Sequence, residues 1–218
     1  MALVLYPLLY FFQKILSFVR PIKVAEFPSE VSEKLELVLY RGQLMLDTET
    51  ANYSYGNLHR VMEAALAETQ KSGHAIQQIL ILGFGGGDAA QILGKHYPQA
   101  AITGVELDPA IIEIYERYYK TRDVRLVQQG AQEFLEQELG LFDLIICDVF
   151  ISLDKPSFTQ TENYYSSIKD RLAKNGLFIQ NTMSENQEVK DLFLHFKKTF
   201  PGGRSSKVLE QNYLLFSN

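Results

Sequence analysis

The chain has 218 residues, of which 46% are hydrophobic and 22% charged, and its formal net charge is -5. This composition is typical of a globular protein and excludes a disordered or fibrous chain. The acidic balance, without a cluster of basic residues, argues against a nucleic-acid partner, because nucleic acids need a clustered basic face. The length allows one large domain, or a domain with a small appendage.

The first twenty residues predict an amphipathic helix. The apolar run from Met1 to Phe12 is shorter than the ~20 residues of a spanning helix and lacks a basic leader and a small-residue cleavage site. We therefore expect no membrane span, and expect the helix to cover another surface of the protein or a second subunit rather than to anchor the chain. Its apolar stripe consists of Leu5, Leu8, Leu9, Phe12, Ile15, Leu16 and Val19.

A β-hairpin is predicted next, with strands at 35–40 and 43–47 and a turn at Arg41-Gly42. A lone hairpin is not stable in water, so this one must pack on another part of the molecule. We interpret residues 1–52 as a helix and β-hairpin module, and residues 53–218 as a Rossmann-like nucleoside-binding domain.

From about residue 56 the pattern alternates between helix and strand. Helices are expected around 58–66, from 87, at 111–118, 131–138, 165–172 and 189–196; strands are expected at 79–83, 101–106, 124–128, 142–148 and 177–181. Ser184 and Gln187 are placed as a capping box, and 207–209 with 213–216 as a final antiparallel pair. This order predicts an α/β, doubly wound, mostly parallel Rossmann-like sheet, with ligands at the carboxyl ends of the strands.

A glycine-rich loop is the most informative motif. The apolar run 79–82 is followed by Gly83, Gly85, Gly86 and Gly87, and the next apolar run ends at Glu106, about twenty residues later. Glycines let the backbone turn sharply and approach a ligand, and an acid at the tip of the second strand can accept hydrogen bonds from ribose hydroxyls. The alternative is a tight turn without a ligand; the spacing of the acid favours a nucleotide or nucleoside site.

Other reactive residues are interpreted conservatively. Cys147 lies in an apolar run and is expected to be a buried free thiol, so the chain needs no oxidising compartment and we expect a cytoplasmic protein. The four histidines have no ligand spacing, and we expect no metal. Tyr53 and Tyr55 precede the first crossover helix and are candidates either for a lid or for packing.

With these strand tips identified, the chain resembles the spermidine synthase-like family, which shares its fold with the class I S-adenosylmethionine-dependent methyltransferases. The resemblance covers roughly residues 35–184. It depends on the segments 41–47, 53–59, 81–87, 104–109, 142–150, 158–165 and 176–180.

The resemblance implies that S-adenosylmethionine or its decarboxylated form binds along the strand tips as the donor. Asp148 falls where aminopropyltransferases place the acid that helps to deprotonate the attacking amine, a step that an alkylamine with a pKa of about 10 requires. A homodimer through the amino-terminal module is also implied. The donor-binding residues would be Gly83, Gly85, Gly86, Gly87, Asp88, Glu106, Leu107, Gly130 and Ala131, and the acceptor-binding residues Tyr55, Val149 and Phe150.

The departures from the family argue against true spermidine synthesis. Ile151 replaces a second aspartate, Gly86 replaces an aspartate of the loop, Gly130 replaces the acid that meets the adenine, and Gly56 replaces a contact to the amine. A dicationic acceptor needs opposing charge, because an unpaired buried ammonium is costly. The alternative is that Asp154 or Asp88 supplies this charge from another direction. Methyl transfer requires less of the protein than spermidine synthesis does, since the sulfonium already carries an activated leaving group.

Three functions therefore remain open. The first is a transferase that moves a methyl or aminopropyl group to a small acceptor. The second is a non-catalytic family member that keeps the fold for assembly or ligand binding. The third, a nicotinamide-dependent oxidoreductase, fits the glycine spacing and the segment 142–150 poorly.

Overall fold

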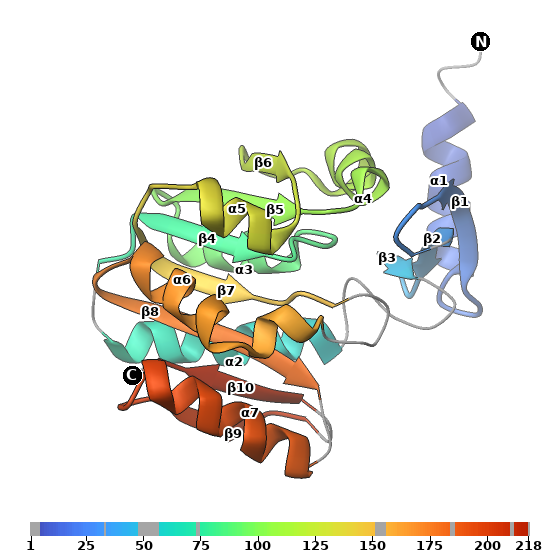
Figure 1. Cartoon of the computed structure of the whole chain (residues 1–218). Coiled ribbons are helices and arrows are strands. Elements are labelled where there is room, and N and C mark those ends of the chain that lie inside the picture. The colour runs from blue at the N-terminus through green and yellow to red at the C-terminus, as the bar shows by residue number, and fades with distance from the viewer. Residues whose placement is uncertain are drawn as a thin grey trace.

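A computed structural model describes residues 5–32, 34–47, 57–72, 75–150, 156–183, 186–209 and 212–217, with side chains for all of these except 5–10, 57–58, 71–72, 186–189 and 191. Two sheets are present in these residues (Figure 1). A three-stranded antiparallel sheet lies in the amino-terminal part, and a seven-stranded mixed sheet forms the body. No helix within the described ranges is long and apolar enough to cross a membrane.

The amino-terminal module consists of a helix and three strands. They are α1 (Leu5–Leu16), β1 (Ile22–Pro28), β2 (Lys34–Tyr40) and β3 (Gln43–Asp47). The predicted hairpin is confirmed as β2 and β3, and both turn residues, Arg41 and Gly42, have a positive φ, as primed two-residue turns require. β1 was not predicted, because a bulge between Lys23 and Ala25 breaks the alternation of polar and apolar residues.

The body alternates helix and strand as predicted. Its elements are α2 (Asn57–Ser72), β4 (Gln78–Leu82), α3 (Asp88–His96), β5 (Ala101–Glu106), α4 (Pro109–Ile114), η2 (Tyr115–Tyr119), β6 (Arg125–Gln128), α5 (Ala131–Gln137), β7 (Phe142–Cys147), η3 (Ser157–Gln160), α6 (Glu162–Arg171), β8 (Leu172–Met183), α7 (Asn186–Thr199), β9 (Arg204–Lys207) and β10 (Asn212–Phe216). The strand order is β6-β5-β4-β7-β8-β10-β9. Five strands are parallel, and β10 inserts antiparallel between β8 and β9.

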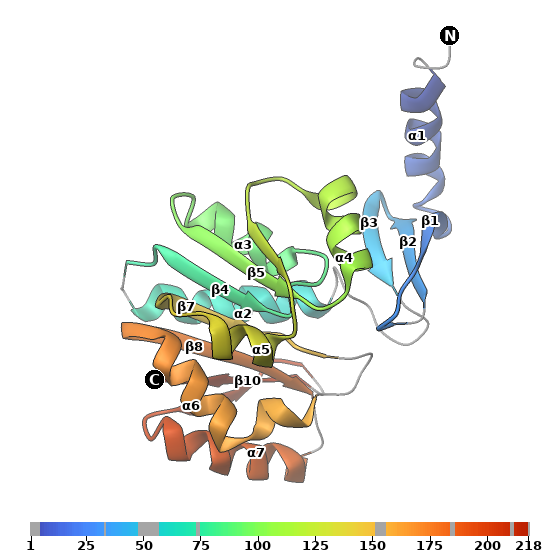
Figure 2. The same cartoon turned by 45° about the horizontal axis from the view of Figure 1, so that its top comes forward.

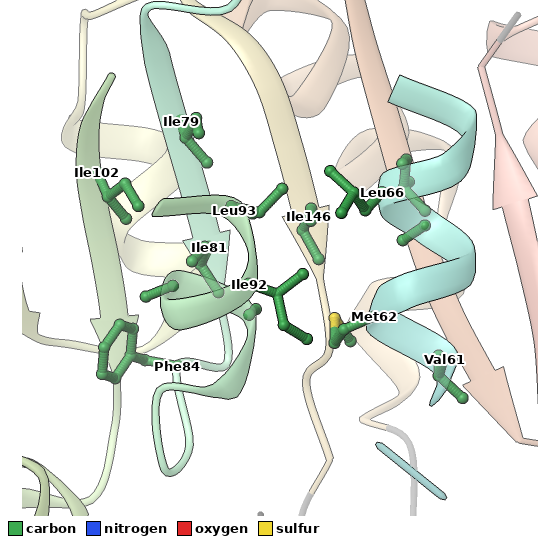
Figure 3. Packing of buried hydrophobic residues seen from close by; sticks show 14 of the residues in the cluster. Val61, Met62, Leu66, Ile79, Ile81, Phe84, Ile92, Leu93, Ile102 and Ile146 are labelled. Carbon is green, nitrogen blue, oxygen red and sulfur yellow. The ribbon is translucent and has the colours of Figure 1, made fainter. Parts of the chain in front are cut away.

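Helices cover both faces of this sheet, as predicted for a doubly wound fold. Alternate residues of β4 enter different clusters: Ile79 and Ile81 pack with α2, α3 and α4, whereas Leu80 and Leu82 pack with α5, α6 and α7. Figure 3 shows the first cluster, in which Met62 and Leu66 of α2 face the strands. Because both faces are buried, the strands are continuous apolar runs.

Three expectations about the elements were wrong in detail, and a fourth is not tested. The strand expected at 207–209 is Arg204–Lys207, an exposed polar edge strand that carries no hydrophobic pattern. Leu172 ends α6 with an extended backbone and begins β8. Helix α4 passes into a π-helical turn, which leaves Tyr118 partly exposed against Phe27 of β1. The capping box at Ser184 and Gln187 lies outside the described side chains.

Helix α1 does not lie on the body of this chain. Figures 1 and 2 show it extending away from both sheets beyond β1 and β2. Phe12, Ile15 and Leu16, part of the stripe that was expected to be covered, are each more than 40% exposed. The expectation that the helix covers another surface of the same chain is therefore wrong. That it packs on a second subunit stays a prediction.

Candidate functional site

The candidate site lies at the carboxyl ends of β4, β5 and β7. From β4 the chain order runs through β5 to β6 on one side, and then returns to β7 and β8 on the other. The strand order therefore reverses between β4 and β7, and in open parallel sheets such a reversal forms a crevice where ligands bind. The predicted loop 83–87, Glu106 and Asp148 all follow or end these three strands.

The glycine loop depends on the absence of side chains. Gly83, Gly85 and Gly87 have φ values of 77°, 54° and 85°, in the left-handed region that favours glycine. A Cβ at Gly83 would lie 2.4 Å from the backbone oxygen of Asp148. The loop after β4 thus lies directly against the residue that follows β7, and only glycine permits this approach.

Two aromatic side chains, Phe84 and Tyr115, pack against the glycine loop. The rings of Phe84 and Tyr115 meet edge to face, with centroids 4.7 Å apart. A Cβ at Gly104 would lie 2.3 Å from Phe84, and a Cβ at Gly87 would lie 2.6 Å from Tyr115. The loop therefore lies on a close-packed base that leaves little freedom to its backbone.

Glu106, the last residue of β5, is held by main-chain groups. Its Oε2 accepts a hydrogen bond from the Gly85 N–H at 2.9 Å, and its Oε1 accepts one from the Asp108 N–H at 3.0 Å. Burial raises the pKa of this carboxyl above its ordinary value, and the backbone hydrogen bonds oppose that rise. A carboxylate has about four lone-pair sites, so these backbone hydrogen bonds do not use its full capacity to accept from hydroxyl donors.

The amino-terminal module contacts the same corner of the sheet. Asp108 caps α4 by accepting from the Ala110 N–H at 2.9 Å, and its other oxygen accepts from the Ser29 hydroxyl at 2.5 Å. Ser29 lies between β1 and β2, and its oxygen also accepts from the N–H groups of Val31 and Ser32. Asp108 thus connects the loop after β1 to Glu106, since its side chain accepts from Ser29 and its N–H donates to Glu106.

Asp148 is held by side chains instead. The Asn181 amide of β8 donates to Asp148 Oδ1 at 2.7 Å, and Asn181 Oδ1 in turn accepts from the Asn212 amide of β10 at 3.2 Å. Asn181 is buried, whereas Asp148, Val149 and Phe150 are half-buried. An acid at the crevice is thereby fixed by a polar chain that crosses three neighbouring strands.

The other predicted residues lie around the same edge. Gly86 is buried within the loop, Asp88 is the half-buried first residue of α3, and Leu107 is 48% exposed next to Glu106. Gly130 and Ala131 begin α5, after β6. A Cβ at Gly130 would meet no atom within 4 Å, so the space beside it is open.

Some of the predicted site residues lie outside the described residues. They are Tyr53, Tyr55, Ile151 and Asp154. Among the residues that the structure describes, no group of three or more acidic, histidine or cysteine side chains is placed to hold a metal ion. A small-molecule acceptor, a homodimer, the absence of a nucleic-acid partner and a cytoplasmic location stay predictions.

Sequence reasoning missed Ser29, Asn181 and Asn212. Asn181 lies in a segment that was expected to end a strand at the ligand edge, so its position carried a signal. Asn212 and Ser29 carried none, because their partners are 31 and 79 residues away in the sequence.

Comparison with known proteins shows similarity to transferases. Residues 79–176 match the family model described as a methyltransferase domain. A polyamine aminopropyltransferase of Vibrio vulnificus is 29% identical over 118 residues, covering 51% of this chain and 39% of that protein. An eEF1A lysine and N-terminal methyltransferase homolog of Drosophila melanogaster is 28% identical over 148 residues, covering 62% of this chain and 22% of that protein. The chain thus spans less than half the length of either relative.

Solved structures show the same fold. A probable spermidine synthase from Corynebacterium glutamicum superposes with a TM-score of 0.73 at 20% identity, covering 90% of this chain and 80% of that one. Human Methyltransferase-like protein 13, in complex with SAH, gives a TM-score of 0.60 at 21% identity, covering 74% of this chain and 82% of that one. The overall fold is thus shared with these two proteins.

Proposed function

Given that this chain has the fold of the class I S-adenosylmethionine-dependent methyltransferases and resembles the spermidine synthases, we propose that it is a transferase. Its donor is S-adenosylmethionine or the decarboxylated form, and its acceptor is a small, partly apolar molecule that receives a methyl or aminopropyl group. Support for the donor comes from relatives of both kinds and from the human neighbour that holds SAH.

The position of Glu106 carries this proposal. Glu106 is buried and ends β5 beside the glycine loop, and its carboxylate accepts hydrogen bonds from the backbone N–H groups of Gly85 and Asp108. Such a group suits the two hydroxyls of a ribose, which donate to a fixed carboxylate without having to order it first. The open space beside Gly130 leaves room for the adenine at the next strand tip.

For the transfer reaction, the chain must position the donor and the acceptor, and it must accept a proton from the acceptor. The donor supplies a carbon bound to a positively charged sulfur. The acceptor lone pair forms a bond to that carbon, while the carbon–sulfur bond breaks and its electron pair stays on the sulfur. Asp148, with Oδ1 held by Asn181, is placed to take the proton that an amine or hydroxyl acceptor loses.

The surroundings of Asp148 favour methyl transfer over aminopropyl transfer to a dication. Val149 and Phe150 are half-buried beside it and provide apolar surface. A single carboxylate balances one positive charge of an acceptor, whereas a second ammonium in this pocket would need another acid. We therefore favour an acceptor with at most one positive charge.

Calorimetry with each donor tests the proposal directly. We expect one of the two donors to bind, and Glu106→Ala to weaken that binding by about tenfold or more, because hydrogen bonds to a charged group contribute about 1.5–3 kcal/mol. Glu136→Ala, which removes an exposed acid on α5, is the matched control and should bind normally. Failure of the folded protein to bind either donor would refute the proposal.

A second assay separates a catalyst from a binding protein. The protein is incubated with the bound donor and pooled amine, hydroxyl and carboxylate acceptors, and mass spectrometry follows the thioether product and the acceptor mass. A gain of one methyl or one aminopropyl group confirms transfer. Donor binding without any product would identify the chain as a non-catalytic member of the fold.

A further inference from the structure

The end of α1 and the bend after it carry a concentration of exposed apolar side chains. We call these residues, together with the basic residues among them, the N-terminal surface. Its apolar members, each exposed by 42% to 82%, are Phe11, Phe12, Ile15, Leu16, Phe18 and Val19. Of the other large exposed apolar side chains among the described residues, Val24 lies in β1 and the rest lie in the body. A local cluster of this kind marks a site of interaction.

The orientation of this surface is fixed by Ser17. The buried Ser17 accepts a hydrogen bond from the Arg41 N–H at its backbone oxygen, at 2.9 Å, and one from the Gly42 N–H at its hydroxyl, at 2.8 Å. Lys14 and Phe18 lie over Gly42, since a Cβ there would be 3.2 Å from each side chain. The helix is thus attached to the turn between β2 and β3, while its far end extends from the molecule (Figure 2).

The charges on this surface are basic. Lys14, Arg20 and Arg41 are exposed, and no ion pair among the described residues includes them. Residues 1–25 contain three basic residues, Lys14, Arg20 and Lys23, and no acidic residue. Lys23 forms ion pairs with Glu26 and Glu36, so the basic residues of the N-terminal surface are Lys14, Arg20 and Arg41, on a chain whose net charge is -5. Positive charge is therefore concentrated where the apolar side chains are exposed, on an otherwise acidic protein.

We propose that the N-terminal surface binds an anionic lipid membrane, with its apolar side chains in the headgroup region and its basic side chains on the phosphates. Aromatic and aliphatic side chains flanked by Lys and Arg are the composition that places a helix on a membrane surface. The 12 described residues of α1 are too few to span a bilayer, and the proposed position of the helix is therefore on the membrane surface.

Charge favours lipid over a second copy of the chain as the occupant. A twofold interface places the same patch of both subunits against itself, so the basic side chains of one subunit, Lys14, Arg20 and Arg41, would face the equally basic patch of the other. Anionic headgroups neutralise these charges instead. This inference does not depend on the donor site.

Vesicle flotation tests the inference with the full chain. We expect it to float with vesicles of phosphatidylcholine and phosphatidylglycerol, and to remain with the soluble fraction when the vesicles contain phosphatidylcholine alone. Added salt should weaken the association, because it screens the attraction. An absence of flotation with the anionic vesicles, or equal flotation with both, would overturn the proposal.

Paired variants identify the surface. Lys14→Gln with Arg20→Gln should lower the partition coefficient roughly thirtyfold, since each basic residue near an anionic surface contributes about 1 kcal/mol. Phe11→Ser with Phe12→Ser and Val19→Ser should abolish flotation. The matched controls, Lys95→Gln with Lys174→Gln and Leu139→Ser with Leu194→Ser, change exposed residues elsewhere and should float as the parent does.

Size and fold are followed in the same variants. Circular dichroism must show the parent spectrum, since each substituted side chain is exposed. Light scattering reveals whether the chain forms a dimer that the triple serine variant dissociates. Such a dimer without vesicle binding would assign the surface to a second copy and refute the lipid proposal.

Discussion

Two acids at neighbouring strand tips are held in different ways. Glu106, after β5, is fixed by the backbone N–H groups of Gly85 and Asp108. Asp148, after β7, is fixed by the side-chain amide of Asn181, which Asn212 supports. The first arrangement depends on the path of the main chain, and the second depends on the identity of side chains from other strands.

This difference suggests how the two parts of the site divide their tasks. A donor common to many transferases can be bound in a site that the backbone forms, provided that glycines permit the conformation of the loop. Acceptors differ between transferases, and side chains that are exchanged one at a time can alter the acceptor pocket. We therefore expect changes near Glu106 to alter donor binding and changes near Asp148 to alter turnover.

Gly83→Ala should disrupt both parts and have the largest effect. The new Cβ would face the Asp148 backbone oxygen at 2.4 Å, at a φ of 77° that an alanine rarely adopts. We expect the free energy of unfolding to fall by about 3 kcal/mol or more, measured by urea denaturation. Gly202→Ala, which meets no atom within 4 Å, is the control and should change stability little. Equal stability of the two variants would show that the loop does not lie against Asp148.

Asn181→Ala should affect only the second part. Loss of its amide frees Asp148 from its fixed rotamer, so we expect kcat to fall about tenfold to a hundredfold while the donor Kd is unchanged. Calorimetry gives the donor Kd, and single-turnover kinetics gives the transfer rate. Asn212→Ala, one step further along the chain of hydrogen bonds, should have a smaller effect on kcat. A change of donor affinity in Asn181→Ala would contradict the division between the two acids.

The pH dependence of donor binding should report Glu106 alone. Ribose hydroxyls donate to the ionised carboxylate, so donor affinity should rise with pH through the raised pKa of Glu106. Below that pKa, each decrease of one pH unit should lower the donor affinity by at most about tenfold. Glu106→Gln should bind weakly at every pH, and calorimetry across the acidic range compares the two proteins. An unchanged pH profile in the variant would assign the titration to another group.

Stability should follow the opposite trend. The folded chain has the higher pKa for Glu106, so between the unfolded and folded values it binds more protons than the unfolded chain. The contribution of this group to the free energy of unfolding therefore decreases as pH rises. Urea denaturation at several pH values should show the parent losing stability, relative to Glu106→Gln, as the pH increases through that interval.

Gly130→Asp should have the smallest effect and should strengthen binding. The space beside Gly130 is open, its backbone φ of -67° suits any residue, and an acid there would face the proposed adenine. We expect donor affinity to increase a few-fold, in line with about 1 kcal/mol for one hydrogen bond. Gly130→Asn caps α5 equally well but lacks the charge, so it separates the effect of the negative charge from a gain in helix stability. Weaker donor binding in both variants would show that the donor occupies this space differently.

Most of the body was predictable because its signals are local. Strands such as 79–82 are buried on both faces and are therefore continuous apolar runs, and the glycines after them mark a turn that other residues cannot make. β9 was predicted with bounds displaced by two or three residues and β1 was not predicted, for the same physical reason. One is exposed and polar throughout, and the other is interrupted by a bulge, so neither carries a regular pattern.

By itself, the sequence determined the alternation of helix and strand, the glycine loop and the acid at the end of β5, because each depends on residues close together in the chain. Only the tertiary structure decided that Gly83 lies against Asp148, that Asn181 and Asn212 hold that acid, and that Ser29 joins the amino-terminal module to the corner beside Glu106. It also decided that α1 extends from the molecule with its apolar residues exposed. These contacts join distant segments, and hydrogen bonds between such segments have no period or spacing that a sequence displays.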